Sequence, residues 1–176
     1  MYGYGGRERI DFGDPMKEAT KAFLIPLSIS LVISAIFCVL FKINADNLTE
    51  LTDANIICMA EGVNVNEKWQ ILFNWGYLMF VGICTAYTMG VVASIVGKLE
   101  YIIAVMCMHA LFSCVNLAFV ITMGVWRYNS WGSACAQEGS VIYQQGAFLQ
   151  NIFITFCVFQ CFNCCFNGLA NKAKPQ

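Results

Sequence analysis

Two of the ten cysteines differ from the rest because they lie in polar segments. Cys58 lies within residues 42–68 and Cys135 within residues 126–146, whereas the other cysteines lie in or beside apolar runs. In an oxidising compartment, a bond between these two segments would tie one half of the chain to the other. Two accessible cysteines allow one internal pairing. We therefore predict a Cys58–Cys135 disulfide, with two free thiols or a bond between chains as the alternatives.

A second group of cysteines closes the last apolar run: Cys161, Cys164 and Cys165. Cysteines at the cytosolic end of a membrane span are frequent S-acylation sites, and we predict acylation here. Their CxxCC order also fits half of a zinc site. A tetrahedral zinc shell needs further ligands, and no second cysteine pair or histidine lies in the same aqueous region. Apolar packing of unmodified cysteines is the remaining alternative.

The only histidine, His109, shares one helical face with Ser113 and Asn116 at positions i, i+4 and i+7. Polar groups at membrane depth normally face inward and often mark a pathway. Three polar residues of the other apolar runs have a similar depth, roughly 12–13 Å from the cytosolic boundary: Ser30, Thr88 and Gln160. We interpret this polar layer as interhelical hydrogen bonds, because no predicted span contains an acidic residue. His109 is then expected to be neutral and structural.

The composition predicts how these residues are positioned, because 59% of the chain is hydrophobic and only 12% is charged. This balance is typical of a membrane protein. Four apolar runs are long enough to cross a bilayer: residues 22–41, 69–96, 101–125 and 147–169. The predicted fold class is an all-α integral membrane protein, a four-transmembrane-helix bundle. The net charge of −1 gives no basis for nucleic-acid binding.

The segments between the spans predict the orientation of the bundle. On one side of the bundle, a head (1–21), a short turn (97–100) and a tail (170–176) carry seven basic residues. On the other side, the loops 42–68 and 126–146 carry three. The positive-inside rule therefore places both termini in the cytosol. Asn47-Leu48-Thr49 in the first outer loop is an N-glycosylation sequon, and we predict a glycan on Asn47.

The second predicted span carries small residues at every fourth position: Gly82, Ala86, Gly90 and Ser94. They form one stripe, which lets another helix approach closely. We predict a close helix contact along this stripe, either inside the bundle or between subunits. Tryptophans at the outer ends of the spans, among them Trp69 and Trp126, together with Arg127, are expected to form an interfacial belt. A ligand or partner surface is the alternative for the cluster around Arg127.

This layout, with one cysteine in each outer loop, resembles the small tetraspan membrane proteins of the MARVEL type and similar orphan four-span families. The most similar segment is GVWRYNSWGSAC, residues 124–135, in which a span leaves the membrane through a tryptophan and reaches a cysteine. The chain departs from tetraspanins, which carry Cys-Cys-Gly, from claudins, which have a tryptophan signature in the first loop, and from connexins, which have three cysteines per outer loop. The resemblance implies organisation of membranes or partners.

No Gly-rich phosphate loop, HExxH or nucleophile elbow is present, so we predict no enzyme and no cofactor or metal. The favoured hypothesis is a structural, scaffolding or accessory subunit that assembles laterally, as a homo-oligomer or within a larger membrane assembly. A pore lined by the His109 face is the alternative, although polarity thins at Leu117–Val120. A redox or acyl-transfer enzyme is a third hypothesis. Membrane lipids are expected partners, in the plasma membrane or a secretory or vesicle membrane, with an organelle membrane as the alternative.

Overall fold

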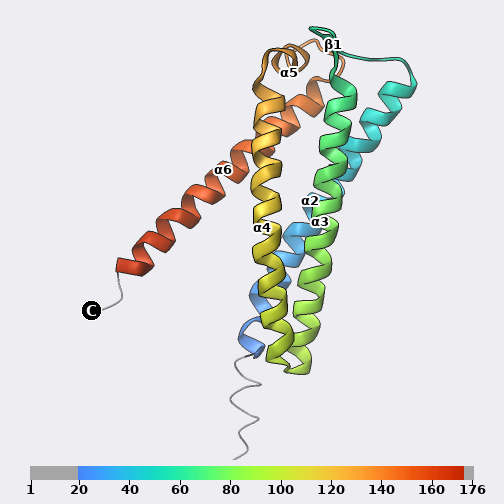
Figure 1. Ribbon diagram of the computed structural model, residues 1–176. Helices are drawn as coiled ribbons and strands as arrows, with labels where there is room; N and C mark the ends of the chain where they lie inside the picture. The colour runs from blue at the N-terminus through green and yellow to red at the C-terminus, as the bar shows by residue number, and fades with distance from the viewer. Residues whose placement is uncertain (1–19, 173–176) are drawn as a thin grey trace, which may run out of the picture.

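The computed structural model describes residues 20–172, and the side chains of residues up to 161. The predicted tail beyond residue 172 and all but the last two residues of the predicted head lie outside this description. In chain order the elements are α2 (Leu24–Asp53), β1 (Met59–Ala60), β2 (Val63–Asn64), α3 (Val65–Val96), α4 (Leu99–Tyr128), α5 (Ser130–Cys135) and α6 (Tyr143–Lys172), as Figure 1 shows.

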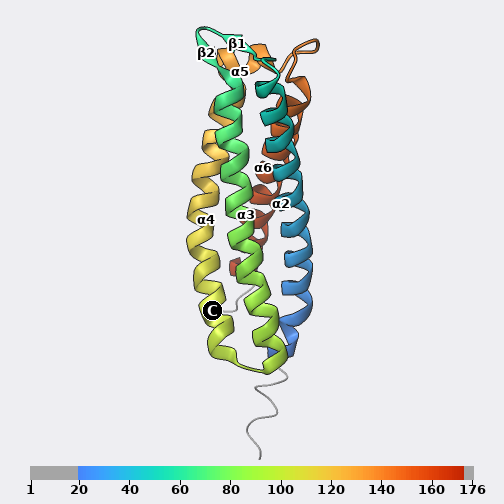
Figure 2. The same ribbon diagram turned by 90° about the vertical axis from the view of Figure 1, so that its right-hand side faces the viewer.

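Three helices of the described chain are long and apolar enough to cross a membrane: Thr20–Asp53, Val65–Val96 and Leu99–Tyr128. The protein is therefore an all-α membrane protein apart from one small hairpin. Helix α3 lies in the middle and packs against both α2 and α4, an arrangement that is clearest in Figure 2. Helix α6, which contains the fourth predicted span, packs against α4 near the end that carries α5 and then leans away from it (Figure 1).

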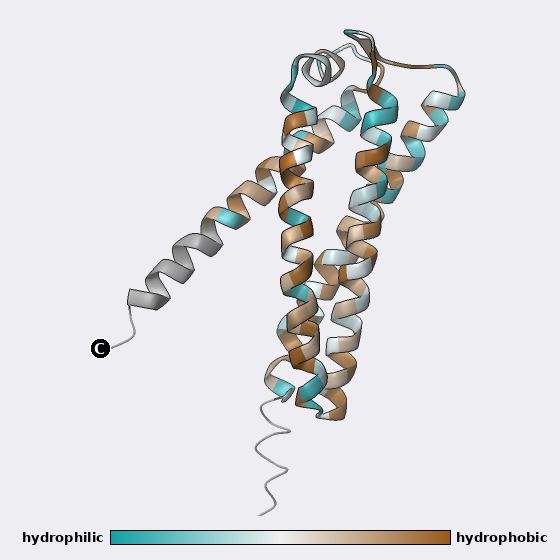
Figure 3. Ribbon diagram, viewed as in Figure 1, coloured by the Kyte–Doolittle hydropathy of each residue, from teal (hydrophilic) through white to brown (hydrophobic). Residues whose placement is uncertain are grey.

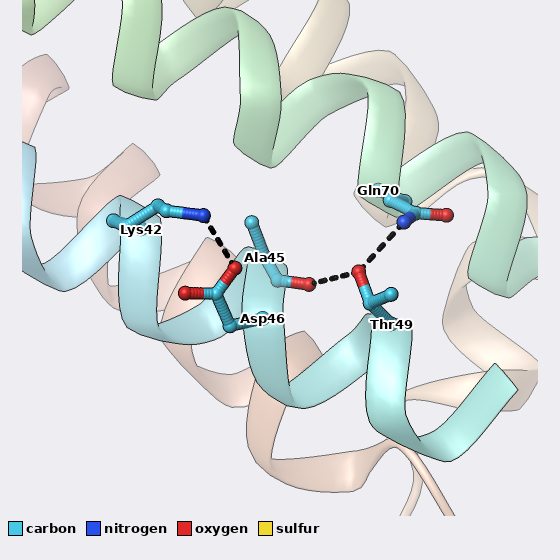
Figure 4. Close-up of polar contacts among 5 residues, drawn as sticks. All are labelled: Lys42, Ala45, Asp46, Thr49 and Gln70. Atoms are coloured by element: carbon cyan, nitrogen blue, oxygen red, sulfur yellow. Dashed lines mark hydrogen bonds and ion pairs between the residues drawn. The ribbon is translucent and has the colours of Figure 1, made fainter. Parts of the chain in front are cut away.

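Helix α2 continues through residues 42–53, which the sequence analysis had assigned to a loop, so that expectation was wrong. Lys42 and Asp46 form an i,i+4 ion pair of 2.6 Å. The Thr49 hydroxyl donates to the carbonyl of Ala45 at 2.9 Å and accepts from Gln70 of α3 at 2.7 Å (Figure 4). Polar residues with this spacing stabilise a helix in water. The fall in hydropathy after Phe41 therefore does not mark the end of the helix.

The connection between α2 and α3 is the antiparallel hairpin β1–β2, in which Met59 pairs with Asn64 and Ala60 with Val63. Its two turn residues, Glu61 and Gly62, both have positive φ, at 51° and 76°. Positive φ at both positions is the geometry of the two-residue turn that matches the twist of a hairpin. Asn64 then caps α3, because its side chain accepts from the backbone N–H of Glu67.

The second outer loop is also more helical than expected, since α5 and the first turn of α6 lie within residues 126–146. Asn129 ends α4 and caps α5, where its side chain accepts from the N–H of Gly132 at 2.8 Å. A Cβ on Gly132 would overlap the carbonyl oxygen of Trp126. The chain can therefore reverse sharply here because position 132 has no side chain.

The largest buried cluster lies towards the end of the bundle that carries the hairpin and α5. Phe41 is fully buried at its centre, and its ring lies 5.6 Å from those of Phe80 and Phe119 and 5.5 Å from that of Phe148. These four rings come from α2, α3, α4 and α6. The packing of α6 on the other helices is thus aromatic. Figure 3 shows hydrophobic residues along the length of the helices and hydrophilic ones gathered at the hairpin end.

Candidate functional site

The hairpin end of the molecule forms a small structured domain, which we call the outer cap: residues 54–64, α5 and residues 136–142. The predicted disulfide between Cys58 and Cys135 is confirmed, with the two Cα atoms 6.0 Å apart. It joins the hairpin to α5 across 77 residues of sequence. Ser130 of α5 also donates to the carboxylate of Glu61 at 2.7 Å, so a second contact fixes the hairpin turn to α5.

Asn66 connects the outer cap to the helices beneath it. It is fully buried, and its amide nitrogen donates to the Thr52 hydroxyl at 3.2 Å and to the Ile56 carbonyl at 2.9 Å. Its amide oxygen accepts from the backbone N–H of Cys58 at 3.0 Å. One side chain therefore joins the end of α2, the hairpin and the start of α3. Buried networks whose members are satisfied make a region rigid.

Arg127 has a similar role on the opposite side of the cap. Only 7% of it is exposed, so the expectation that it belongs to an interfacial belt was wrong. Its Nε donates to the carbonyl oxygen of Gly146 and its terminal nitrogen to the side-chain oxygen of Gln150, each at 2.8 Å. These bonds attach α6 to the end of α4. Trp69 is likewise fully buried, packed close to Gly146.

The outer cap exposes apolar side chains next to this rigid framework. Ile56 and Ile57 are each 38% exposed and Met59 is 60% exposed. We call these three residues the apolar rim. They follow α2, whose residues beyond Phe41 extend about 18 Å at 1.5 Å per residue. The polar interfacial layer of a bilayer is only about 5–7 Å thick on each side. With the predicted end of the first span at Phe41, the apolar rim would therefore lie too far from the hydrocarbon core to be covered by lipid tails.

The sequon residue Asn47 lies on the exposed surface of α2 and lines a cavity of about 550 Å³ together with residues 139–141 and 143–145. The second sequon residue, Leu48, is fully buried, and the hydroxyl of Thr49 is already engaged in two hydrogen bonds. The sequon is therefore part of a packed helix, although sequons that receive glycans usually lie in surface loops. Glycosylation of Asn47 stays a prediction.

The small-residue stripe of α3 makes its close contacts inside this chain. A Cβ on Gly82 would lie 2.8 Å from the ring of Phe112 in α4. A Cβ on Gly90 would lie 3.1 Å from Leu27 in α2 and 3.3 Å from Val105 in α4. The other two residues of the stripe are buried: Ala86 and Ser94. Of the two alternatives left open, contact within the bundle is the one observed.

The predicted polar layer is assembled only in part. His109 Nδ1 lies 3.2 Å from the hydroxyl of Tyr87 in α3, and Ser30 of α2 lines the same cavity. Tyr87 was missed by the sequence analysis, which selected its neighbour Thr88. The hydroxyl of Thr88 donates to the carbonyl of Cys84 on its own helix, so Thr88 does not join the layer.

The remaining members of that layer make no hydrogen bond to the His109 ring in the described structure. Ser113 donates to the His109 carbonyl within α4, and the buried oxygen Oδ1 of Asn116 has no partner in the described structure. Gln160 is exposed on the part of α6 that leans away. The layer therefore joins α2, α3 and α4 but not α6.

Of the cysteines predicted to be acylated, Cys161 is exposed with a free thiol. Cys164 and Cys165 lie outside the residues whose side chains the structure describes. Within the described residues, no group of three or more histidine, cysteine, aspartate or glutamate side chains could hold a metal ion. Acylation of the three cysteines stays a prediction.

Comparisons with protein family models, with curated proteins and with solved structures found no match. The resemblance to small tetraspan proteins therefore stays a prediction. Two features of the structure could bind a partner or ligand: the outer cap with the apolar rim, and the cavity beside His109.

Proposed function

We propose that the chain is a non-enzymatic, four-span membrane protein with both termini in the cytosol, and that it is a structural, scaffolding or accessory subunit. Residues 147–169 of α6 form the fourth span. The outer cap then faces a lumen or the cell exterior, where a disulfide persists. A plasma membrane or a secretory or vesicle membrane provides such a compartment. Lateral assembly places the protein next to itself or to another membrane subunit.

The apolar rim is the observation that carries this proposal. Ile56, Ile57 and Met59 are exposed beyond the reach of lipid tails, and exposed apolar patches of this kind mark protein interaction sites. The disulfide and Asn66 hold the rim in one conformation. Binding to a rigid surface costs less conformational entropy than binding to a flexible loop. The partner is a membrane protein whose outer domain reaches the same height above the bilayer.

The small-residue stripe is not the assembly surface, because Leu27, Val105 and Phe112 already cover it. A pore along the His109 face has less support. Ser113 is satisfied on its own helix, and beyond Asn116 the same face of α4 continues with the buried, apolar Val120. A continuous polar path along α4 is therefore not formed by the described residues.

The test of assembly compares charged substitutions at two exposed positions of the outer cap. Ile57→Asp combined with Met59→Asp introduces charge into the rim, whereas Val141→Asp, which is 53% exposed elsewhere in the cap, is the matched control. The mass of the detergent-solubilised particle, measured by light scattering or native mass spectrometry, should fall for the rim variant only. An intact Cys58–Cys135 bond, read from non-reducing gels, confirms folding. Equal masses for the parent and both variants would reject the rim as the assembly surface.

The test of topology uses reporters at the two ends of the chain. A fluorescent protein that folds only in the cytosol should be active when fused to either terminus. Activity at the N-terminus but not at the C-terminus would mean that α6 does not cross the membrane. The four-span arrangement would then be wrong, whatever the result for the apolar rim.

A further inference from the structure

A cavity of about 200 Å³ lies between α2, α3 and α4 in the half of the bundle farther from the outer cap. Its walls are mostly apolar and include Leu27, Val105 and Met106. Three polar side chains, one from each helix, line the same cavity: Ser30, Tyr87 and His109. An apolar pocket with a few convergent polar groups is the usual form of a small-molecule site.

The polar groups leave hydrogen-bonding capacity for a ligand. The hydroxyl of Tyr87 and Nδ1 of His109 are 3.2 Å apart, so one of them donates to the other. If the tyrosine donates, the histidine is left with a free Nε2–H; if the histidine donates, the tyrosine hydroxyl keeps its own hydrogen. The Ser30 hydroxyl is hydrogen-bonded to that of Tyr87, so the three side chains form one connected group. They carry three O–H or N–H donors and use two of them among themselves, so one donor is left for a ligand.

Helix α6 leaves the cavity uncovered. On α3, Phe73, Phe80 and Tyr87 are spaced by seven residues and therefore share one face. Phe148 of α6 packs on Phe73, and Phe156 packs on Phe80, with ring centroids 5.9 and 6.3 Å apart. Helix α6 is inclined to the other helices and diverges from them towards its C-terminal end (Figure 1), and Phe159 and Gln160, which follow Phe156, are exposed. No α6 residue up to 161, where the description of side chains ends, lines the cavity beside Tyr87, the next residue on this face, so this part of α6 leaves the cavity open on that side.

We propose that this cavity binds the ring head group of an uncharged, membrane-embedded lipid with a carbonyl oxygen, of the quinone type. A cavity of about 150 Å³ accommodates benzene, so 200 Å³ holds one six-membered ring while the tail remains in the bilayer. The Tyr87–His109 pair donates to the carbonyl oxygen. No Lys, Arg, Asp or Glu is among the described residues that line the cavity, which disfavours carboxylate and phosphate head groups. This binding is independent of assembly through the outer cap.

The depth of the polar groups separates this ligand class from a sterol. Ser30 lies seven residues beyond Phe23 along the first helix, and both line the cavity, so the polar end is about 10 Å farther along the helix axis than the apolar end at Phe23. A rigid four-ring lipid whose hydroxyl is held at the membrane surface would meet the apolar end of the cavity. A quinone-type ring, which resides within the hydrocarbon region, reaches the polar end.

The experiment uses the full chain reconstituted in phosphatidylcholine nanodiscs and a photoreactive benzoquinone with a decyl tail as the probe. Saturable labelling is expected in peptides covering residues 23–30 and 102–109, with competition by unlabelled decylbenzoquinone. Tyr87→Phe removes a hydroxyl while keeping the ring, and loss of one hydrogen bond should weaken binding roughly fivefold to tenfold. Met106→Trp fills the cavity from a residue that is 59% exposed and should abolish labelling.

The matched control is Ser113→Ala, which lies one turn further along α4 and is bonded only to its own helix. It should bind the probe as the parent does. Three results would overturn the proposal. One is labelling that does not saturate or persists in Met106→Trp, which indicates partition into the bilayer only. Another is saturable labelling by a photoreactive cholesterol or palmitate probe with none by the quinone. The third is cross-linking at this site between two copies of the chain.

Discussion

The half of the molecule next to the outer cap and the half next to the α3–α4 turn are held together by different kinds of contact. Near the cap, large rings from the three other long helices surround Phe41 of α2, and a disulfide, Asn66 and Arg127 join the helix ends. Near the turn, the contacts are small-residue contacts along α3, such as Gly90 against Leu27 and Val105. There α6 takes no part in the packing that the structure describes (Figure 1).

Because of this difference, we infer that the half next to the outer cap is rigid and that the half next to the α3–α4 turn is more adaptable. A cross-linked, hydrogen-bonded cap presents the apolar rim in one geometry, which suits recognition of a fixed partner surface. A half in which one helix diverges leaves room beside Tyr87 and His109 for a ligand. Four predictions test the contrast, ordered from the largest expected effect to the smallest.

Replacing both Cys58 and Cys135 by serine should cause the largest loss of stability. The bond closes a loop of 77 residues, and disulfides over loops of this size stabilise proteins by about 2–5 kcal/mol. Thermal unfolding in detergent, with and without reductant, measures the loss. The matched control is Cys107→Ser with Cys114→Ser, two exposed free cysteines of α4. If the control loses as much stability as the cap variant, the contrast between the halves fails.

Arg127→Met should have the next largest effect, about 3 kcal/mol, because it leaves the Gly146 carbonyl and the Gln150 side chain without their donor. The methionine occupies much of the same volume, so the loss comes mainly from unpaired polar groups. The free energy of unfolding in mixed detergent micelles measures it. Gln150→Leu added to Arg127→Met removes one of the unpaired acceptors and should restore part of the loss. No recovery in the double variant would count against this explanation.

These two predictions also show which features the sequence could and could not provide. Cys58 and Cys135 were identifiable because each is the only cysteine in its polar segment. The stripe on α3 was identifiable from a spacing of four residues. Both signals depend on local sequence alone. Whether the stripe packs within or between chains depends on Leu27 and Phe112, which are distant in sequence.

Other features escaped prediction because they depend on tertiary partners. Arg127 was expected at the membrane interface, yet it is buried because Gly146 and Gln150 happen to face it. Residues 42–53 were predicted to form a loop because they are polar. Hydropathy indicates whether a segment faces water or lipid, but not whether its backbone is helical. Tyr87 escaped notice since an aromatic residue in a span usually indicates packing. The signal that could have found it is its heptad spacing from Phe73 and Phe80.

Gly90→Leu tests the weaker half, and we expect a loss of about 2 kcal/mol. A Cβ at this position already lies 3.1 Å from Leu27, so a branched side chain must displace α2 or α4. Gly90→Ala is the control, with a smaller loss because one methyl group needs a shift of only a few tenths of an ångström. Combining Gly90→Leu with Leu27→Ala should recover part of the stability. A Gly90→Leu protein that unfolds like the parent would mean that the α3 stripe is not tightly packed.

The smallest effect is expected for the contact between Ser130 of α5 and the hairpin residue Glu61, both of which are exposed. The hydrogen bond is 2.7 Å long and its acceptor is charged. Because both side chains are exposed, water can hydrogen-bond to each of them when the contact is lost, so the loss of free energy is small. A double-mutant cycle with Ser130→Ala and Glu61→Gln should give a coupling energy below about 1 kcal/mol.

The same contact separates the stability of the protein from its recognition of a partner, since Glu61 is close in sequence to Met59 of the apolar rim. If assembly depends on the orientation of the hairpin, Ser130→Ala should lower the fraction of assembled particles more than it lowers the unfolding temperature. Ser133→Ala, on the same short helix, is the control and should change neither. A coupling energy above about 2 kcal/mol would mean that this exposed contact shares in the rigidity that we assign to the disulfide and Asn66.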